Sequence, residues 1–119
     1  MLVVYHLIWC PKRRKAILIG ALKERLEQLI SEVADEHGWT LLTVAIQPDH
    51  VHLFLRSDPY TAPSDIARLI KGRSSRVLRE EFPELLKLPS LWTHSFFVST
   101  AGNVSQEIIQ RYIERQKNI

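Results

Sequence analysis

The sequence contains a single cysteine, Cys10, among its 119 residues. One cysteine cannot form an internal disulfide, and it cannot build the cysteine-rich frameworks that hold structural zinc. The apolar stretch from Met1 to Cys10 is too short to span a bilayer, and it lacks the basic start and the small-residue cleavage site of a signal peptide. We therefore expect a protein of the reducing cytoplasm, without a membrane segment.

A strong charge imbalance is also missing. Sixteen basic residues against 13 acidic ones give a net charge of +3. This excess indicates nucleic-acid binding only weakly, because the clustering of charges matters more than their sum. Internal repeats, low-complexity tracts and linkers are absent, and 45% of the residues are hydrophobic. The composition therefore predicts one globular domain over residues 1–119 rather than a disordered chain.

Hydrophobic periodicity predicts alternating strands and helices along the chain. Strands are expected at Leu2–Trp9, Trp39–Ile46, His50–Arg56 and Trp92–Thr100. Helices are expected at about Ala16–His37, Pro63–Glu81 and Val104–Lys117. The order is the ferredoxin-like βαββαβ plan, an α+β fold whose antiparallel sheet carries both crossover helices on one face. The added C-terminal helix is expected to lie on the open sheet face or against a partner subunit.

Two histidines in the third predicted strand form the first candidate site. Side chains alternate along a strand, so His50 and His52 share one face while the residues between and after them point to the core. Residues two apart on a strand have Cα atoms about 6.5–7 Å apart, so the two imidazoles can converge on one metal ion. A polar sheet face with two solvated histidines is the ordinary alternative for so short a motif.

The last predicted helix carries the second candidate site. Tyr112 and Gln116 are four residues apart, so a hydroxyl and an amide oxygen lie on one helix face. A partly buried tyrosine at a helix surface is the alternative. Asp49, beside the histidine pair, is expected to cap a turn rather than to tune a metal site. Three further histidines are left outside the expected ligand set: His6, His37 and His94.

A series of short motifs runs along nearly the whole chain: Tyr5-His6-Leu7-Ile8-Trp9, Pro11-Lys12-Arg13-Arg14, Pro48-Asp49-His50-Val51-His52-Leu53, Ile70-Lys71-Gly72-Arg73-Ser74-Ser75, Leu91-Trp92, Phe96-Phe97-Val98-Ser99-Thr100 and Tyr112-Ile113-Glu114-Arg115-Gln116. In this order they resemble the single-tyrosine HUH transposases of the insertion-sequence-200-like kind, where HUH means histidine, bulky hydrophobe, histidine. Several spaced matches are far more specific than one His-x-His pair.

The resemblance implies a DNA transposase that cuts and rejoins single strands. It implies that His50, His52 and Gln116 bind one divalent metal, Mg²⁺ or Mn²⁺. It also implies that the Tyr112 oxygen attacks the scissile phosphate, which leaves a 5′-phosphotyrosine and a free 3′-hydroxyl. The implied partners are single-stranded DNA, from hairpin ends of an insertion sequence, and a second copy of the chain. In such a homodimer, each site combines the histidine pair of one chain with the tyrosine helix of the other.

Basic residues gather in two places that are candidates for contacts with the DNA backbone. The first is a loop that contains Lys12, Arg13, Arg14 and Lys15. The second is the middle predicted helix, with Arg68, Lys71, Arg73 and Arg76. A solvated basic helix face is the alternative for the second group. Four aromatic residues are candidates for stacking on bases, although most are expected in the core: Trp39, Trp92, Phe96 and Phe97.

Three other functions stay open on the sequence alone. A ferredoxin-like module could grip single-stranded nucleic acid without cutting it, although histidines occupy the sheet face where stacking aromatics would be expected. A small metal-dependent hydrolase would release its product without a covalent protein–DNA adduct. A domesticated or inactive relative of the transposases would keep the motifs without the mobility.

Overall fold

In this computed structural model, the described residues are 2–100. The elements are β1 (Val3–Trp9), η1 (Lys12–Arg14), α1 (Gly20–His37), β2 (Thr40–Gln47), β3 (His50–Ser57), α2 (Pro63–Glu81), η2 (Pro83–Lys87) and β4 (Phe97–Thr100), with η1 and η2 being short 3-10 helices. The helix predicted at Val104–Lys117, together with Tyr112 and Gln116, lies outside the described residues. Within residues 2–100, no helix is long and apolar enough to cross a membrane.

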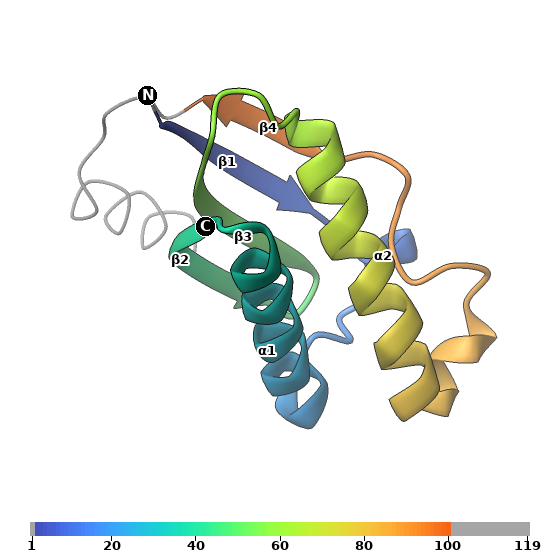
Figure 1. The fold of residues 1–119 in the computed structure, drawn as a ribbon. Coiled ribbons are helices and arrows are strands. Elements are labelled where there is room, and N and C mark those ends of the chain that lie inside the picture. Colours follow the sequence, from blue (N-terminus) through green and yellow to red (C-terminus); the bar gives the residue numbers. More distant parts are fainter. Residues whose placement is uncertain (1, 101–119) are drawn as a thin grey trace.

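The strands form one antiparallel sheet in the order β2-β3-β1-β4. Pro48 and Asp49 close the β2–β3 hairpin, which confirms the predicted turn. Figure 1 shows α1 and α2 beside each other on one face of this sheet. The predicted α+β, ferredoxin-like arrangement is therefore confirmed.

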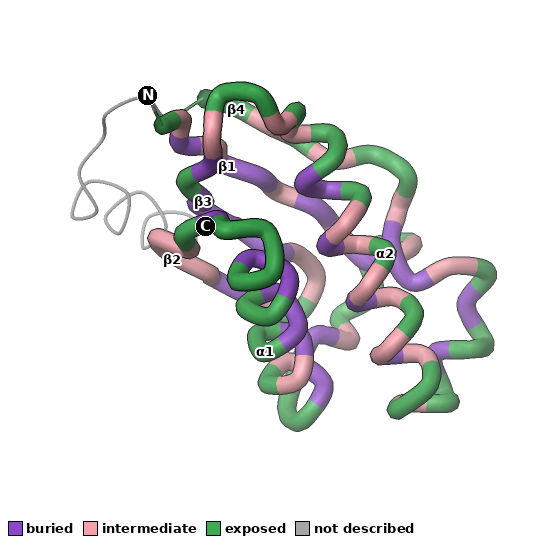
Figure 2. Tube along the Cα trace, viewed as in Figure 1, coloured by how far each residue is buried: buried purple, intermediate pink, exposed green. Residues whose placement is uncertain are grey.

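The main core lies between the helices and the sheet face that they cover. Alternate residues of β3 point into it, and Val51, Leu53 and Leu55 are fully buried there. The helices contribute apolar side chains at steps of three and four residues: Leu22, Leu26, Leu29, Val33, Ile66 and Ile70. Figure 2 shows the same alternation of buried and exposed positions along both helices. The apolar residues that alternate along the strand and those that recur every three or four residues along the helices thus pack together in one layer.

The first helix begins later than its periodicity predicts. Gly20, not Ala16, is its first residue, and Ile19 before it is extended. The backbone N–H of Leu18 donates to the carbonyl of Pro48 at 3.0 Å, which ties this segment to the β2–β3 turn. The helix ends as predicted, with Gly38 in a left-handed conformation at φ 72°.

The fourth strand is also shorter than predicted, because it begins at Phe97 rather than Trp92. Trp92 makes only an isolated bridge to Pro11. The Lys71 Nζ donates to the carbonyl oxygens of Thr93 at 2.6 Å and Ser95 at 3.2 Å. A lysine from α2 therefore pairs with carbonyls that a longer strand would direct at a neighbouring strand. The other described boundaries of strands and α-helices fall within one residue of their predicted positions.

Candidate active site

The antiparallel register of β1 and β3 brings three histidines together on the sheet face away from the helices. His50 and His52 come from β3, and His6 comes from β1, where it pairs with Phe54. His52 and His6 are each 4% exposed, and the side chain of His50 is 21% exposed. The predicted alternation of β3 is confirmed, since Val51 lies on the opposite face in the main core.

The two predicted ligands lie close together, and Nδ1 of each has a partner. The ring centroids of His50 and His52 are 4.9 Å apart, with planes at 79°. Nδ1 of His50 lies 2.7 Å from Oδ1 of Asp49 and donates to that carboxylate. Nδ1 of His52 lies 3.1 Å from Nε2 of His6. Nε2 is therefore the remaining nitrogen of both rings, and it is the atom through which each could bind a metal.

Burial favours the neutral form of His52 and of His6. It lowers the pKa of His52 to about 4, and repulsion from His50 and His6 adds to the effect. Burial also lowers the pKa of His6. Metal ligation requires the neutral imidazole, so at neutral pH protons do not compete for His52.

Asp49 links the histidine pair to the basic loop. Its Oδ2 accepts a hydrogen bond from Nη2 of Arg14 at 3.2 Å, while Oδ1 accepts from His50. The hydrogen bond from His50, with help from Arg14, lowers the pKa of the Asp49 carboxyl. These contacts support a role beside the metal site, which the sequence left as the alternative to turn capping, because the carboxylate bridges a candidate ligand and a cation.

The described part of the site fits two ligands of a divalent metal. Two imidazoles, at least one of them held neutral by burial, suit a divalent cation that keeps open positions for phosphate and water. Within residues 2–100, no group of three His, Cys, Asp or Glu side chains is arranged to hold a metal ion. The third predicted ligand, Gln116, and the predicted nucleophile, Tyr112, lie outside the described residues.

Sequence reasoning missed His6 as a neighbour of the ligands. The contact between His6 and His52 spans 46 residues of sequence and depends on the β1–β3 register, which a single sequence does not reveal. The available signal was the place of His6 within the Tyr-His-x-x-Trp motif.

The predicted basic loop lies beside the site, and the predicted basic helix does not. Arg13 and Arg14 in η1 are exposed and adopt positive φ angles of 60° and 51°. Lys15 is exposed and Lys12 half-buried, and the Arg14–Asp49 pair fixes this loop next to His50. By contrast, α2 covers the opposite face of the sheet, where it packs on the main core.

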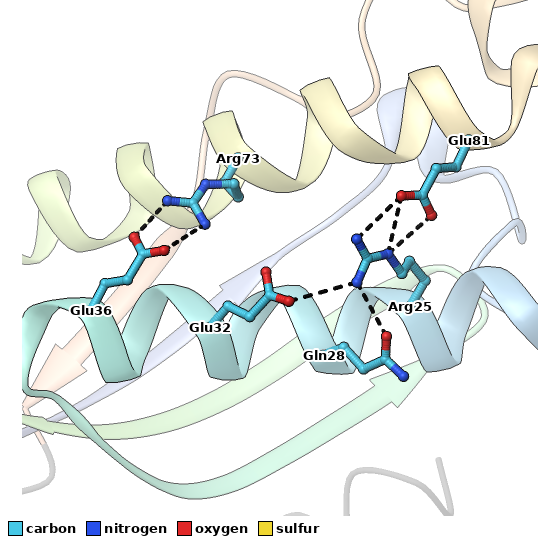
Figure 3. A network of polar contacts seen from close by, with 6 residues as sticks. All are labelled: Arg25, Gln28, Glu32, Glu36, Arg73 and Glu81. Atoms are coloured by element: carbon cyan, nitrogen blue, oxygen red, sulfur yellow. Dashed lines mark hydrogen bonds and ion pairs between the residues drawn. The ribbon is translucent and has the colours of Figure 1, made fainter.

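The predicted basic residues of α2 point in different directions. Arg68 pairs weakly with Asp65 and lines, with Lys71, a cavity of about 410 Å³ beside Trp92 and Phe96. Arg73 donates two hydrogen bonds to Glu36 of α1, at 2.6 and 3.0 Å (Figure 3). Arg76 is exposed. The cation of Arg73 thus belongs to an interhelical ion pair.

The four aromatic residues divide as the sequence predicts. Trp39 and Trp92 are both buried in the core at 5% exposure. Phe96 is partly buried against the same core. Phe97 is 56% exposed and lies edge-on to His6, with ring centroids 6.3 Å apart. It is the one of the four that is positioned on the histidine side of the sheet.

Comparison with known proteins gives consistent matches over nearly the whole chain. Residues 1–116 match a family model described as IS200-like transposase. The chain is 35% identical over 115 residues to the ISDra2 transposase TnpA of Deinococcus radiodurans, an alignment that covers 94% of this chain and 82% of that protein.

Two solved structures are similar in fold. A crystal structure from Deinococcus radiodurans, of a protein assigned as a transposase, superposes with a TM-score of 0.79 at 33% identity, covering 98% of this chain and 92% of that one. A REP-associated tyrosine transposase bound to a REP hairpin superposes with a TM-score of 0.69 and covers 98% of this chain and 68% of that one. Its 16% identity shows a shared fold alone.

Proposed function

Because the chain belongs to the family of IS200-like transposases, we propose that it cuts and rejoins single-stranded DNA through a covalent phosphotyrosine intermediate. The observation that carries this proposal is the His50–His52 pair, whose rings lie 4.9 Å apart with Nδ1 of each already engaged. Such a pair, in a single-tyrosine HUH domain, supports a metal site that acts on a phosphodiester.

His50 and His52 would hold the metal through Nε2, and Gln116 would add an amide oxygen. When bound, a divalent cation, Mg²⁺ or Mn²⁺, supplies a Lewis acid that polarises the scissile phosphate. The protein's own contribution is to keep His52 neutral by burial, and to hold His50 against Asp49.

Tyr112 is the proposed nucleophile. Its phenol oxygen attacks the phosphorus, a new tyrosine–phosphorus ester bond forms, and the bond from phosphorus to the 3′-oxygen breaks. The phenol proton is lost, and the 3′-oxygen leaves and is protonated, which gives a free 3′-hydroxyl. The reverse attack by a 3′-hydroxyl from another strand reseals the DNA, and the intermediate ester conserves the energy of the broken bond. A free tyrosine ionises near pH 10, so the site must favour the phenolate.

The proposed DNA path starts at the basic loop of Lys12, Arg13, Arg14 and Lys15. Support for it comes from the Arg14–Asp49 contact, which joins this loop to the histidine pair. Arg68, Lys71, Arg73 and Arg76 of α2 are proposed as contacts for DNA outside the cleavage site, because α2 lies on the other sheet face. Hairpin ends are the proposed substrate, and the REP-associated tyrosine transposase that shares this fold is itself bound to a REP hairpin.

A homodimer is proposed as the active form. In it, the histidine pair of one chain would meet the tyrosine helix of the other. The family supports this arrangement. Mixing Tyr112→Phe and His50→Ala chains tests it, since a shared site regenerates one intact centre and restores cleavage, whereas a site within one chain does not.

The experiment that tests the proposed function is a cleavage assay on single-stranded hairpin DNA with Mg²⁺ or Mn²⁺, analysed on a denaturing gel. The DNA carries its label at the 3′ end, because the 5′-phosphate of the 3′ fragment is the group that would be joined to Tyr112. We expect label to migrate with the protein for the full chain, and not for Tyr112→Phe or His50→Ala. Cleavage without any protein-linked label would instead identify a hydrolase. DNA binding without cleavage would identify a binding module.

A further inference from the structure

We propose that His6 and Asp49 are positioning residues that set the tautomers of His52 and His50, so that both rings keep Nε2 unprotonated for the metal. The inference rests on the proposed metal site and deepens it. It assigns a task to two residues that bind neither metal nor DNA in the proposed reaction.

A neutral imidazole carries its proton on one nitrogen or the other, and only the unprotonated nitrogen can bind a metal. A hydrogen-bond acceptor at Nδ1 holds the proton there and leaves Nε2 as the donor atom. Partners of this kind orient metal-binding histidines in many proteins. Both ligand histidines here have a polar partner at Nδ1: a carboxylate oxygen of Asp49 for His50, and a ring nitrogen of His6 for His52.

The contact between Asp49 and His50 involves a charged, partly exposed carboxylate. A carboxylate only accepts, so Nδ1 of His50 must carry the proton in this 2.7 Å contact. The second oxygen of Asp49 is held by Arg14 at 3.2 Å, so the carboxylate is fixed from two sides. His50 therefore has one permitted tautomer while this contact lasts.

The contact between His6 and His52 is buried and involves no carboxylate. The ring of His6 is stacked on Phe54, with centroids 4.2 Å apart and planes within 3°. Phe97 approaches the same ring edge-on at 6.3 Å. These contacts hold Nε2 of His6 at 3.1 Å from His52, where it can accept from Nδ1–H. In a site where His52 is 4% exposed, no bulk water is available to replace that acceptor.

His6 could in principle be a metal ligand itself. Its geometry opposes this, because the nitrogen that it directs at His52 meets Nδ1 rather than sharing a common point with both Nε2 atoms. The number of imidazole nitrogens bound to Mn²⁺ separates the two roles. The positioning role predicts two such nitrogens, and a ligand role predicts three.

The test uses the full chain and the metal alone. His6→Phe keeps the stack on Phe54 and removes the acceptor, while His6→Gln restores an acceptor oxygen. Asp49→Ala removes the other acceptor. Two controls change the same residue types away from the site: His37→Gln, where His37 contacts Val33 at the end of α1, and Asp35→Asn on the exposed side of α1.

The first readout is the tautomer of His50 and His52 in metal-free protein, from long-range proton–nitrogen spectra of nitrogen-15-labelled chain. The natural protein is expected to show both rings protonated at Nδ1. In His6→Phe, His52 alone is expected to shift toward Nε2 protonation, and in Asp49→Ala the same is expected of His50. His6→Gln is expected to restore the natural spectrum of His52.

The second readout is Mn²⁺ affinity from electron paramagnetic resonance titration. His6→Phe is expected to bind Mn²⁺ about 10- to 100-fold more weakly, the usual effect of removing such a partner, and His6→Gln to recover most of the loss. Circular dichroism on each variant establishes that it is folded. Unchanged tautomers and unchanged affinity in folded His6→Phe would overturn the inference and leave the proposed function standing. If the natural chain binds no Mn²⁺, the metal site itself is refuted, and the inference with it.

Discussion

The guanidinium of Arg73 in α2 donates two hydrogen bonds to the carboxylate of Glu36 in α1, at 2.6 and 3.0 Å. About two turns further along α2, Glu81 accepts from Arg25 of α1, at 2.9 Å. Figure 3 shows the two ion pairs as parallel bridges between the helices, with Gln28 and Glu32 also facing Arg25. The two helices on the covered face of the sheet are thus joined by charge as well as by apolar packing.

Loss of either residue of the Arg73–Glu36 ion pair is expected to lower the melting temperature equally. Glu36→Gln and Arg73→Gln each break the same bidentate ion pair. Each is therefore expected to lower the melting temperature by the same small amount, on the order of 2 °C for a surface pair. The double variant should be no less stable than either single one. Thermal unfolding followed by circular dichroism measures this, and additive losses would show that the two residues act separately.

A buried hydroxyl on α2 supports the segment before β4. The Trp92 indole N–H donates to Oγ of Ser74 at 3.0 Å, and that hydroxyl donates to the carbonyl of Ile70 at 2.7 Å. Ser74→Ala leaves a buried indole N–H without its acceptor, which costs about 1–3 kcal/mol of unfolding free energy. Urea denaturation measures the loss. Ser75→Ala, its less buried neighbour, serves as the control and is expected to change little.

The lowered pKa of His52 predicts a pH dependence of stability. Its folded-state pKa of about 4 lies below the unfolded value of 6.5. The unfolded chain therefore gains a proton first as pH falls, and stability that is complete above pH 6.5 is lost progressively down to pH 4. Between pH 7 and pH 5 the loss attributable to this residue is about 2 kcal/mol.

Urea titrations of metal-free protein at pH 7 and pH 5 measure that loss. His52→Gln does not titrate in this range, so its stability should fall less than that of the natural chain by about this amount. Equal falls in the two proteins would show that His52 protonates in the folded state as readily as in the unfolded state.

The basic loop predicts a change in the salt dependence of DNA binding. Arg13 and Lys15 are exposed beside the site, and neither has a carboxylate partner among the ion pairs formed within residues 2–100. If each meets one phosphate, the Arg13→Ala/Lys15→Ala variant should reduce the slope of log affinity against log salt by about 1.4 for single-stranded DNA. Fluorescence anisotropy over a range of salt measures the slope. Lys87→Ala, an exposed cation in η2, should leave it unchanged.

Much of the fold follows from local pattern, and this part of the prediction is confirmed. Alternation along β3 places His50 and His52 on one face, since a strand has a fixed period of two residues. Gly38 ends α1 where a left-handed residue is required. These features depend on neighbouring residues alone, so one sequence is enough to predict them.

The errors share a different origin, because each depends on a distant contact. Thr93 and Ser95 do not extend β4, since Lys71 of α2 pairs with their carbonyls. The segment before Gly20 is extended rather than helical, and its Leu18 N–H donates to the distant carbonyl of Pro48. Strand register and side-chain partners of this kind are set by tertiary packing, which local propensity does not encode. The roles of Tyr112, Gln116 and the α2 cations stay predictions.

The proposed reaction forms a metal-dependent covalent link between Tyr112 and the 5′-phosphate at a cut in single-stranded DNA. Digestion of the protein after reaction with hairpin DNA and Mn²⁺, followed by mass spectrometry of the peptides, tests it most directly. We expect a phosphodeoxynucleotide on the peptide that contains Tyr112, absent with EDTA and absent from His50→Ala. A DNA adduct on any other residue, or cleaved DNA with no adduct at all, would contradict it.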